Sequence, residues 1–317
     1  MRIDQRRLNW GVFLIILGAV PLAWHAGAIP TSAVADAWRL WPLILIGLGL
    51  GVILARTPAA FLGGLIVASM MGVVVGGALS AGPNVGCGNG HNQATTTRDG
   101  TFSGSATITL NLQCGSATVG ASQDASWHVS AVNDAGHTPT IAASATSLSV
   151  TSYNGGWWPD RGAETWQVLL PADTTVSLTS TLDFGDAHLA LGGAKLSAAT
   201  VTLNMGSVHV DLTGATVGRL SLSTNLGKAW LELDSLSNLV GDVSTSLGSL
   251  DVCAPASLGL RIKSSESLAS SDMGALGMTL AGDSWQTPNY ATAEHRANLT
   301  VSTSLGSLKL HSAGGCK

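Results

Sequence analysis

A glycine recurs every 21 residues in the C-terminal half of this chain. Gly185, Gly206, Gly227 and Gly248 lie in the similar segments TLDFGDAHLAL, TLNMGSVHVDL, STNLGKAWLEL and STSLGSLDV. Two further copies, outside the strict spacing, surround Gly115 (LNLQCGSATV) and Gly306 (STSLGSLKL). A fixed repeat of this length indicates one structural unit stacked on itself.

Apolar and polar residues alternate on both sides of each glycine. Leu203 and Met205 precede Gly206 at alternate positions, whereas Val208 and Val210 follow it at offsets of two and four. A period of two is typical of a strand with one buried face. The change of parity across the glycine predicts a bend or bulge. We therefore predict structural corners at Gly115, Gly185, Gly206, Gly227, Gly248 and Gly306.

The repeat length fits one turn of a flattened coil, because 21 residues of about 3.3 Å each extend for about 70 Å. Coils stacked about 4.8 Å apart would align one residue from each coil in an internal column. That column would contain Phe184, Met205, Leu226, Leu247 and Leu305. The sequence thus predicts an all-β solenoid, β-helix-like, over residues 101–317. An antiparallel sandwich of hairpins is the alternative, although it does not require a strict register.

Three apolar stretches near the N-terminus, at about residues 10–28, 38–55 and 58–81, have lengths suited to membrane-spanning helices. Arginines before the first stretch and after the second predict a cytoplasmic N-terminus. We expect a three-helix transmembrane region at 1–81, a linker at 82–100 and an extracytoplasmic domain at 101–317 of a multi-pass protein in membrane lipid. A cleaved signal peptide is the alternative for the first stretch, since the small residues of SAVADA follow it.

Four cysteines, Cys87, Cys114, Cys253 and Cys316, all lie in the part expected outside the cell, where disulfides persist. Three pairings are possible. In the alternation of the strands, Cys114 occupies a position expected to face the core, whereas Cys253 occupies a position expected to face outward. This difference favours the pairing of Cys87 with Cys114 and of Cys253 with Cys316.

Two histidines are candidate metal ligands. His188 and His209 each lie three residues after a repeat glycine, so the stacked coils would bring them together, near Asp211 and Glu232. Such a set can bind zinc or copper. An ordinary solvated row of side chains is the simpler interpretation, and we expect neither metal nor cofactor.

Other function classes find little support in the sequence. With 11% charged residues and a net charge of -4, the chain has no basic patch for nucleic acid. It contains no recognised catalytic motif, so we do not expect an enzyme. Trp157 and Trp158 lie in a glycine-rich loop, where they could contact a ligand or a membrane surface, or cover the end of a coil.

The segments WGVFLIILGAVPL and WPLILIGLGLGVIL resemble the transmembrane region of LiaI/LiaF-type envelope-stress proteins. ETWQVLLPADTTVSLTSTLDFGDAHLAL, LDVCAPASLGLRI and NLTVSTSLGSLKL are similar to the LiaF C-terminal and toast-rack or adhesin-like domains. The resemblance implies an accessory regulator or sensor of the cell-envelope stress response, partnered by a histidine kinase or another integral membrane protein. It supplies no catalytic residues. The alternative is a structural or adhesive cell-surface protein that binds wall polymer or other cells.

Overall fold

The computed structural model describes residues 92–155 and 161–316, together with residues 11, 14, 15, 19, 69 and 87. The chain forms two compact units, Met1–Val85 and Gly86–Lys317. The membrane spans predicted at 10–28, 38–55 and 58–81 lie almost wholly outside the described residues, as do Trp157 and Trp158. Within the part of the chain that the structure describes, there is no helix long and apolar enough to cross a bilayer.

The described part of the second unit is nearly all β-sheet, with fourteen strands in one connected sheet. The elements in chain order are β1 Ala94–Thr101, β2 Ala106–Ser122, β3 Ser126–Asn133, β4 Thr140–Ala143, β5 Ser147–Thr151, β6 Glu164–Pro171, β7 Thr175–Ala190, β8 Lys195–Asp211, β9 Thr216–Glu232, β10 Leu239–Ala254, β11 Gly259–Asp272, the 3-10 helix η4 Met273–Leu276, β12 Thr279–Ala281, β13 Ser284–Gln286 and β14 Arg296–Ser312. The first strand, β1, begins within the segment predicted as a linker.

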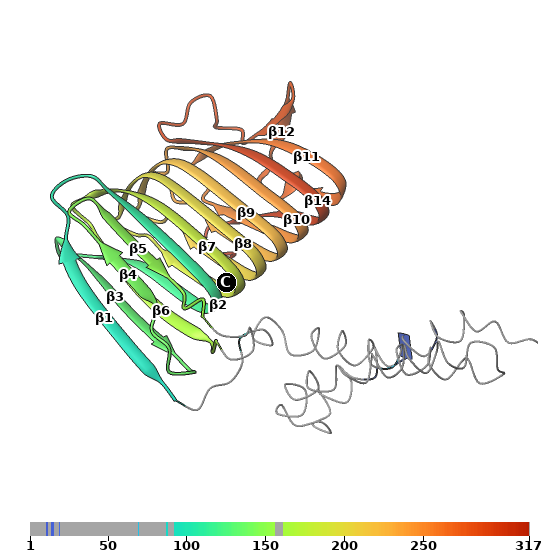
Figure 1. The fold of residues 1–317 in the computed structure, drawn as a ribbon. Coiled ribbons are helices and arrows are strands. Elements are labelled where there is room, and N and C mark those ends of the chain that lie inside the picture. The colour runs from blue at the N-terminus through green and yellow to red at the C-terminus, as the bar shows by residue number, and fades with distance from the viewer. Residues whose placement is uncertain are drawn as a thin grey trace, which may run out of the picture. The chain divides into compact units, whose positions relative to one another are not determined.

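Seven long strands lie side by side and parallel, in the order β2, β7, β8, β9, β10, β14 and β11 (Figure 1). We call them the parallel stack. Equivalent residues of successive repeats are direct neighbours, so Gly185 pairs with Gly206 and Gly206 with Gly227. The 21-residue period therefore corresponds to one long strand and one short turn. Strand β14 lies between β10 and β11, which departs from chain order.

The repeat glycines have a backbone conformation that other residues rarely adopt. Their φ angles lie between 135° and 147° at Gly115, Gly185, Gly206, Gly227, Gly248 and Gly306. A Cβ atom on Gly206 would lie 1.8 Å from the carbonyl oxygen of Gly185 on the neighbouring strand. Glycine is thus needed at this corner for its conformation and for the close approach of adjacent coils.

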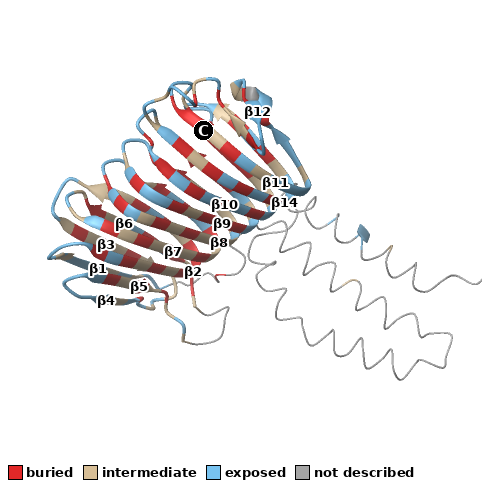
Figure 2. Cartoon of the chain, turned by 90° about the horizontal axis from the view of Figure 1, so that it is seen from above, coloured by how far each residue is buried: buried red, intermediate tan, exposed pale blue. Residues whose placement is uncertain are grey.

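In the long strands other than β11, both halves cover one core. In β9, Leu220 and Leu222 are buried before the glycine, and Ala229 and Leu231 are buried after it. All four belong to one hydrophobic cluster. Figure 2 shows the resulting alternation of buried and more exposed residues along the strands. The core therefore extends along the whole stack, as expected for a strand with one buried face.

The change of parity occurs before the glycine. The ladder between β8 and β9 passes from Leu203–Thr224 to Met205–Leu226 and leaves Asn204 and Asn225 unpaired. Residues beyond this irregularity face the other side of the sheet, because an extra residue reverses the alternation. The predicted internal column is therefore an external one: Met205 is 38% exposed and Leu226 42%.

Shorter strands cover the β2 end of the stack. The first half of β2 pairs with β5, whereas its second half pairs with β6. Strand β4 extends β5, and β3 and β1 extend β6 in antiparallel fashion. The two halves of β2 therefore pair with different strands on this side of the sheet.

At the opposite end, β11 terminates the stack. Among the described strands, β13 is its only partner besides β14, and it pairs with Arg261 and Ile262 alone. Ala269 pairs with Gly306, at the place where the other strands have glycine. Glu266 is exposed beside the buried Thr303 of β14. A polar residue in a core position of an edge strand disfavours the addition of another strand.

Candidate binding surface

An exposed row of apolar side chains follows the corner of the parallel stack. We call it the corner ridge, and it consists in strand order of Phe184, Met205, Leu226, Leu247, Leu305 and Leu268. Phe184 is half-buried, and exposure rises from 38% at Met205 to 76% at Leu268. With strands about 4.8 Å apart, the ridge is about 24 Å long. A contiguous apolar surface of this kind is typical of an interaction site.

Polar residues border the corner ridge on both sides. The residues directly before the ridge positions are Asp183, Asn204, Asn225, Ser246, Ser304 and Ser267. The residues that follow the corner positions are Asp186, Ser207, Lys228, Ser249, Ser307 and Ser270. Carboxylates thus border the β7 end, whereas serines border the β14 and β11 end.

Hydrogen bonds between coils fix part of this border. Asn225 Nδ2 donates to Asn204 Oδ1 at 2.6 Å, and Asn204 Nδ2 donates to Asp183 Oδ1 at 2.7 Å. Ser207 donates to Asp186 on the other side of the ridge. These side chains are therefore held in place before any partner binds, which lowers the entropy cost of binding.

The two candidate histidines do lie together, on the face opposite the core. The rings of His188 and His209 are 5.0 Å apart and nearly perpendicular. His209 Nε2 lies 3.7 Å from Glu232 Oε2, whereas Asp211 accepts a hydrogen bond from the backbone of Thr213. Within the described ranges, no three His, Cys, Asp or Glu side chains are grouped so that they could hold a metal ion.

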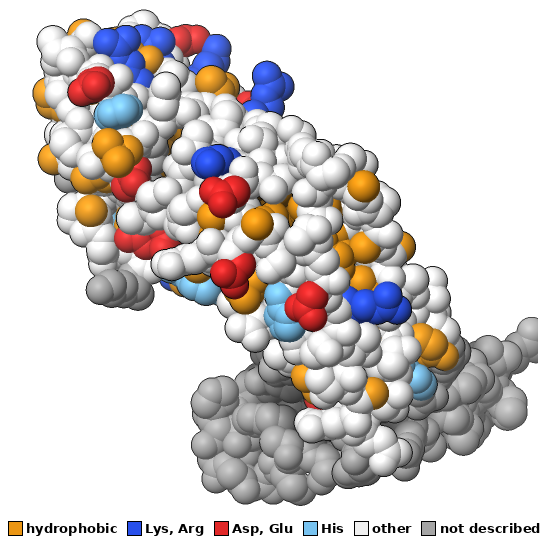
Figure 3. Space-filling view, turned by 90° about the vertical axis from the view of Figure 1, so that its left-hand side faces the viewer, with side chains coloured by type: hydrophobic (Ala, Val, Ile, Leu, Met, Phe, Trp, Pro, Cys, Tyr) orange, Lys and Arg blue, Asp and Glu red, His pale blue; other side chains and the backbone are white. Residues whose placement is uncertain are grey.

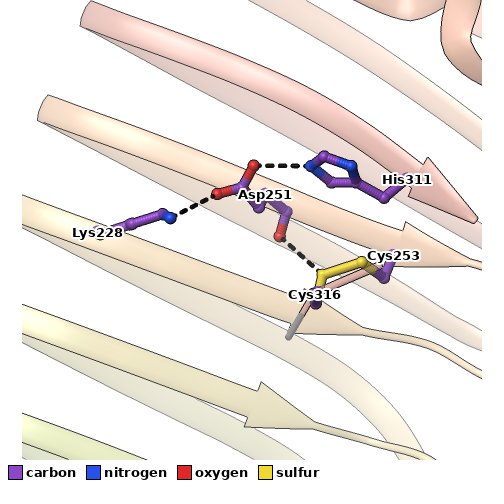
Figure 4. A network of polar contacts seen from close by, with 5 residues as sticks. All are labelled: Lys228, Asp251, Cys253, His311 and Cys316. Carbon is purple, nitrogen blue, oxygen red and sulfur yellow. Dashed lines mark hydrogen bonds and ion pairs between the residues drawn. A yellow bond between two sulfur atoms is a disulfide. The ribbon is translucent and has the colours of Figure 1, made fainter. Parts of the chain in front are cut away.

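A buried carboxylate lies further along the same face (Figure 4). Asp251 is 5% exposed. Its Oδ1 lies 2.9 Å from His311 Nε2 and its Oδ2 lies 3.4 Å from Lys228 Nζ. Lys228 Nζ also lies 4.2 Å from the ring centroid of Trp230. The repeat did not predict this network, because Lys228 and His311 lie two positions away from Trp230 and Lys309, the residues that pair with Asp251 in the adjacent strands.

Two disulfides close the second unit, with the pairing that the parity argument favoured. Cys87 bonds to Cys114 at the β2 end of the stack. Cys253 bonds to Cys316 and so fixes the segment after β14 against β10, beside Asp251 (Figure 4). The covalent closure of a chain loop stabilises a fold mainly by restricting the unfolded chain.

A second buried carboxylate lies beside the first disulfide. Glu164 is 3% exposed and lines a hollow of about 10 Å³. Its oxygens accept hydrogen bonds from Ser152 Oγ, Tyr153 N, Asn133 Nδ2 and Trp166 Nε1, at 2.7 to 3.2 Å. Four donors satisfy the carboxylate, so its role is to join β6 to the segments around it.

The β11 end of the stack has an open hollow of about 340 Å³ between β11 and β14, lined in part by Ser270, Asp272 and Lys309. On the first half of β11, away from this hollow, Lys263 Nζ lies 2.6 Å from Asp283 Oδ2. The hydrogen bond from Lys263 lowers the pKa of the Asp283 carboxyl, and the same bond raises the pKa of the lysine. Both groups are on the surface.

On the face shown in Figure 3, most of the visible surface is backbone or side chains that are neither charged nor apolar. The charged groups on this face are scattered, with gaps of uncharged surface between them. Binding through this face would therefore depend on apolar contact and hydrogen bonds rather than on a strong field.

No known protein family matches the chain, and no curated protein matches it. Two solved structures are similar to it. A candidate cell adhesion protein from Clostridium sporogenes ATCC 15579 is 13% identical with a TM-score of 0.48, and the match covers 70% of this chain and 100% of that chain. A candidate adhesin from Bacteroides fragilis NCTC 9343 is 13% identical with a TM-score of 0.32 and the same coverage. Both scores are below 0.5, so neither likeness assigns a function to this chain.

Proposed function

We propose that this chain is a non-enzymatic protein of the cell surface whose β unit adheres to other surfaces. The observation that carries the proposal is the corner ridge, a continuous exposed apolar row on a scaffold of in-register strands. A contiguous exposed apolar patch, unlike scattered apolar residues, often marks a functional surface.

The two disulfides support an extracytoplasmic location. Cys87–Cys114 and Cys253–Cys316 would be reduced in most bacterial cytosols but persist outside the membrane. The scattered charge and the polar borders of the ridge support contact with a partner rather than chemistry on a substrate.

The test is adhesion of cells that display the full chain, compared with the same host without it. We expect sedimentation of cell aggregates, or retention on a coated surface, only with the chain present. Replacement of residues 10–81 by a single anchor helix should preserve adhesion. An unchanged behaviour of displaying cells, with the chain shown to be on the surface, would refute the proposal.

A regulatory role is the second candidate, favoured by the sequence features GLGLG and GVVVG, whose small residues let helices pack closely. In that case the predicted spans would pass the state of the β unit to a histidine kinase. Capture of the full chain from detergent extracts should then recover such a kinase. Its absence under both stress and resting conditions would argue against regulation.

A further inference from the structure

We propose that the corner ridge binds the corner ridge of a second copy of this chain, with the two ridges antiparallel. The inference rests on the proposed adhesive function and names its partner: the protein would join cells that both display it.

The spacing of the ridge favours a second copy. Leu226, Leu247 and Leu305 belong to neighbouring strands, so their side chains recur about every 4.8 Å. A second ridge has the same interval and can stay in register along the full length. Turns of a helix recur about every 5.4 Å, so a helix would drift by about 3 Å over the five intervals.

The charges beside the ridge favour the antiparallel arrangement. Asp183 and Asp186 border the β7 end, whereas Ser267 and Ser270 border the β11 end and are exposed. Parallel ridges would place each carboxylate opposite its own copy, which is unfavourable. Antiparallel ridges place the carboxylates opposite serine hydroxyls, which can donate hydrogen bonds to them.

The same charges disfavour a lipid surface as the occupant. Insertion of the ridge into a bilayer would bring the two carboxylates toward the headgroups. Lys228 is the basic residue of the two border rows, and it is engaged by Asp251. The ridge thus lacks the basic groups that attract proteins to anionic membranes.

The size of the contact sets its strength. A ridge roughly 24 Å long and about 10 Å wide offers a few hundred Å² to its partner, whereas stable complexes bury about 800 Å² on each side. A single pair of ridges should therefore dissociate readily. Many copies on two facing cells would act together, and their combined avidity can hold the cells.

The test uses cysteine cross-linking between cells that display the full chain. One cell population carries Leu226→Cys and the other carries Leu247→Cys, and each is also mixed with itself. In the antiparallel arrangement Leu226 of one copy lies opposite Leu247 of the other. Under mild oxidation we expect at least about tenfold more disulfide-linked dimer in the mixed suspension than in either single suspension.

Leu236→Cys is the matched control, because Leu236 is 64% exposed and lies off the ridge. It should give no more dimer with Leu247→Cys than the background of the single suspensions. Equal cross-linking by the control, or preferential linking of each variant to itself, would overturn the arrangement. No cross-linking in any pair of adhering populations would overturn ridge pairing altogether.

A second pair of variants separates this inference from the proposed function. Leu226→Ser with Leu247→Ser should abolish aggregation, whereas Leu236→Ser with Val240→Ser should preserve it, since all four side chains are at least 42% exposed. Displaying cells that instead adhere to cells lacking the chain, and do so equally well with the ridge variant, would give a different result. That result would support the adhesive function and refute self-binding. Cross-linked dimers without adhesion would support self-binding and refute the adhesive function. Binding to phosphatidylcholine vesicles that the ridge variant loses, with no cross-linking between the cysteine variants, would identify lipid as the occupant and refute the proposal.

Discussion

Replacement of Gly206 by alanine should strongly destabilise the parallel stack. The new Cβ would lie 1.8 Å from Gly185 O, about half of a normal carbon–oxygen contact, and the φ of 135° is unfavourable for alanine. A sparsely populated conformation costs about 1–3 kcal/mol, and overpacking of a rigid site costs about 1–3 kcal/mol more. We expect a loss of about 3–5 kcal/mol in the free energy of unfolding, a large part of a typical total.

Gly193→Ala is the control, because Gly193 also has a positive φ, 83°, but an added Cβ would meet nothing within 4 Å. It should lose only about 1–2 kcal/mol, the cost of a left-handed conformation. Denaturant unfolding of the full chain, followed by the fluorescence of the buried Trp127 and Trp166, gives both values. If the two variants lost the same stability, contact between coils would not be what requires glycine at the corner.

Three further predictions concern single sites and the same unfolding measurement. Joint replacement of Cys253 and Cys316 by serine opens a link between residues 63 apart and should cost about 4 kcal/mol, whereas an unchanged midpoint would show that the link adds no stability. Glu164→Gln presents an amide NH₂ to hydrogen-bond donors and should cost about 1–3 kcal/mol; a neutral result would contradict the four-donor arrangement. Thr245→Val should be neutral or slightly stabilising, because the buried Thr245 hydroxyl has no hydrogen-bond partner among the residues that the structure describes; a clear loss of stability would indicate a bound water.

The repeat predicted the register of the stack correctly. Equal spacing of glycines implies that equivalent residues are neighbours, and Gly227 does pair with both Gly206 and Gly248. This part of the fold follows from the sequence because a parallel, in-register stack uses the same local contacts in every coil.

The burial of the ridge residues was predicted wrongly, because parity was counted up to the glycine. The irregularity lies two residues earlier, at Asn204 and its equivalents, so Met205 faces outward. The amide residues at this position were a usable signal, because an unpaired residue with an outward side chain is more often polar. The apolar residue directly before the glycine continued the alternation in the sequence, so the irregularity was not recognised.

The strand order at the β11 end could not be read from the sequence. Strand β14 returns to lie between β10 and β11, and the longer interval between Gly248 and Gly306 shows only that extra residues intervene. The contact of Asp251 with His311 depends on this return, since His311 belongs to β14, whereas Lys228 belongs to the preceding strand β9. Such long-range placement follows from tertiary packing rather than from local periodicity.

The in-register stacking of the interior coils has an evolutionary consequence. Because each interior coil contacts only its two neighbours through the same set of bonds, a gene duplication of one 21-residue segment could be accommodated without redesign of either end. Each added segment would lengthen the molecule by about 4.8 Å. Homologous chains are then expected to differ in length by whole multiples of this segment.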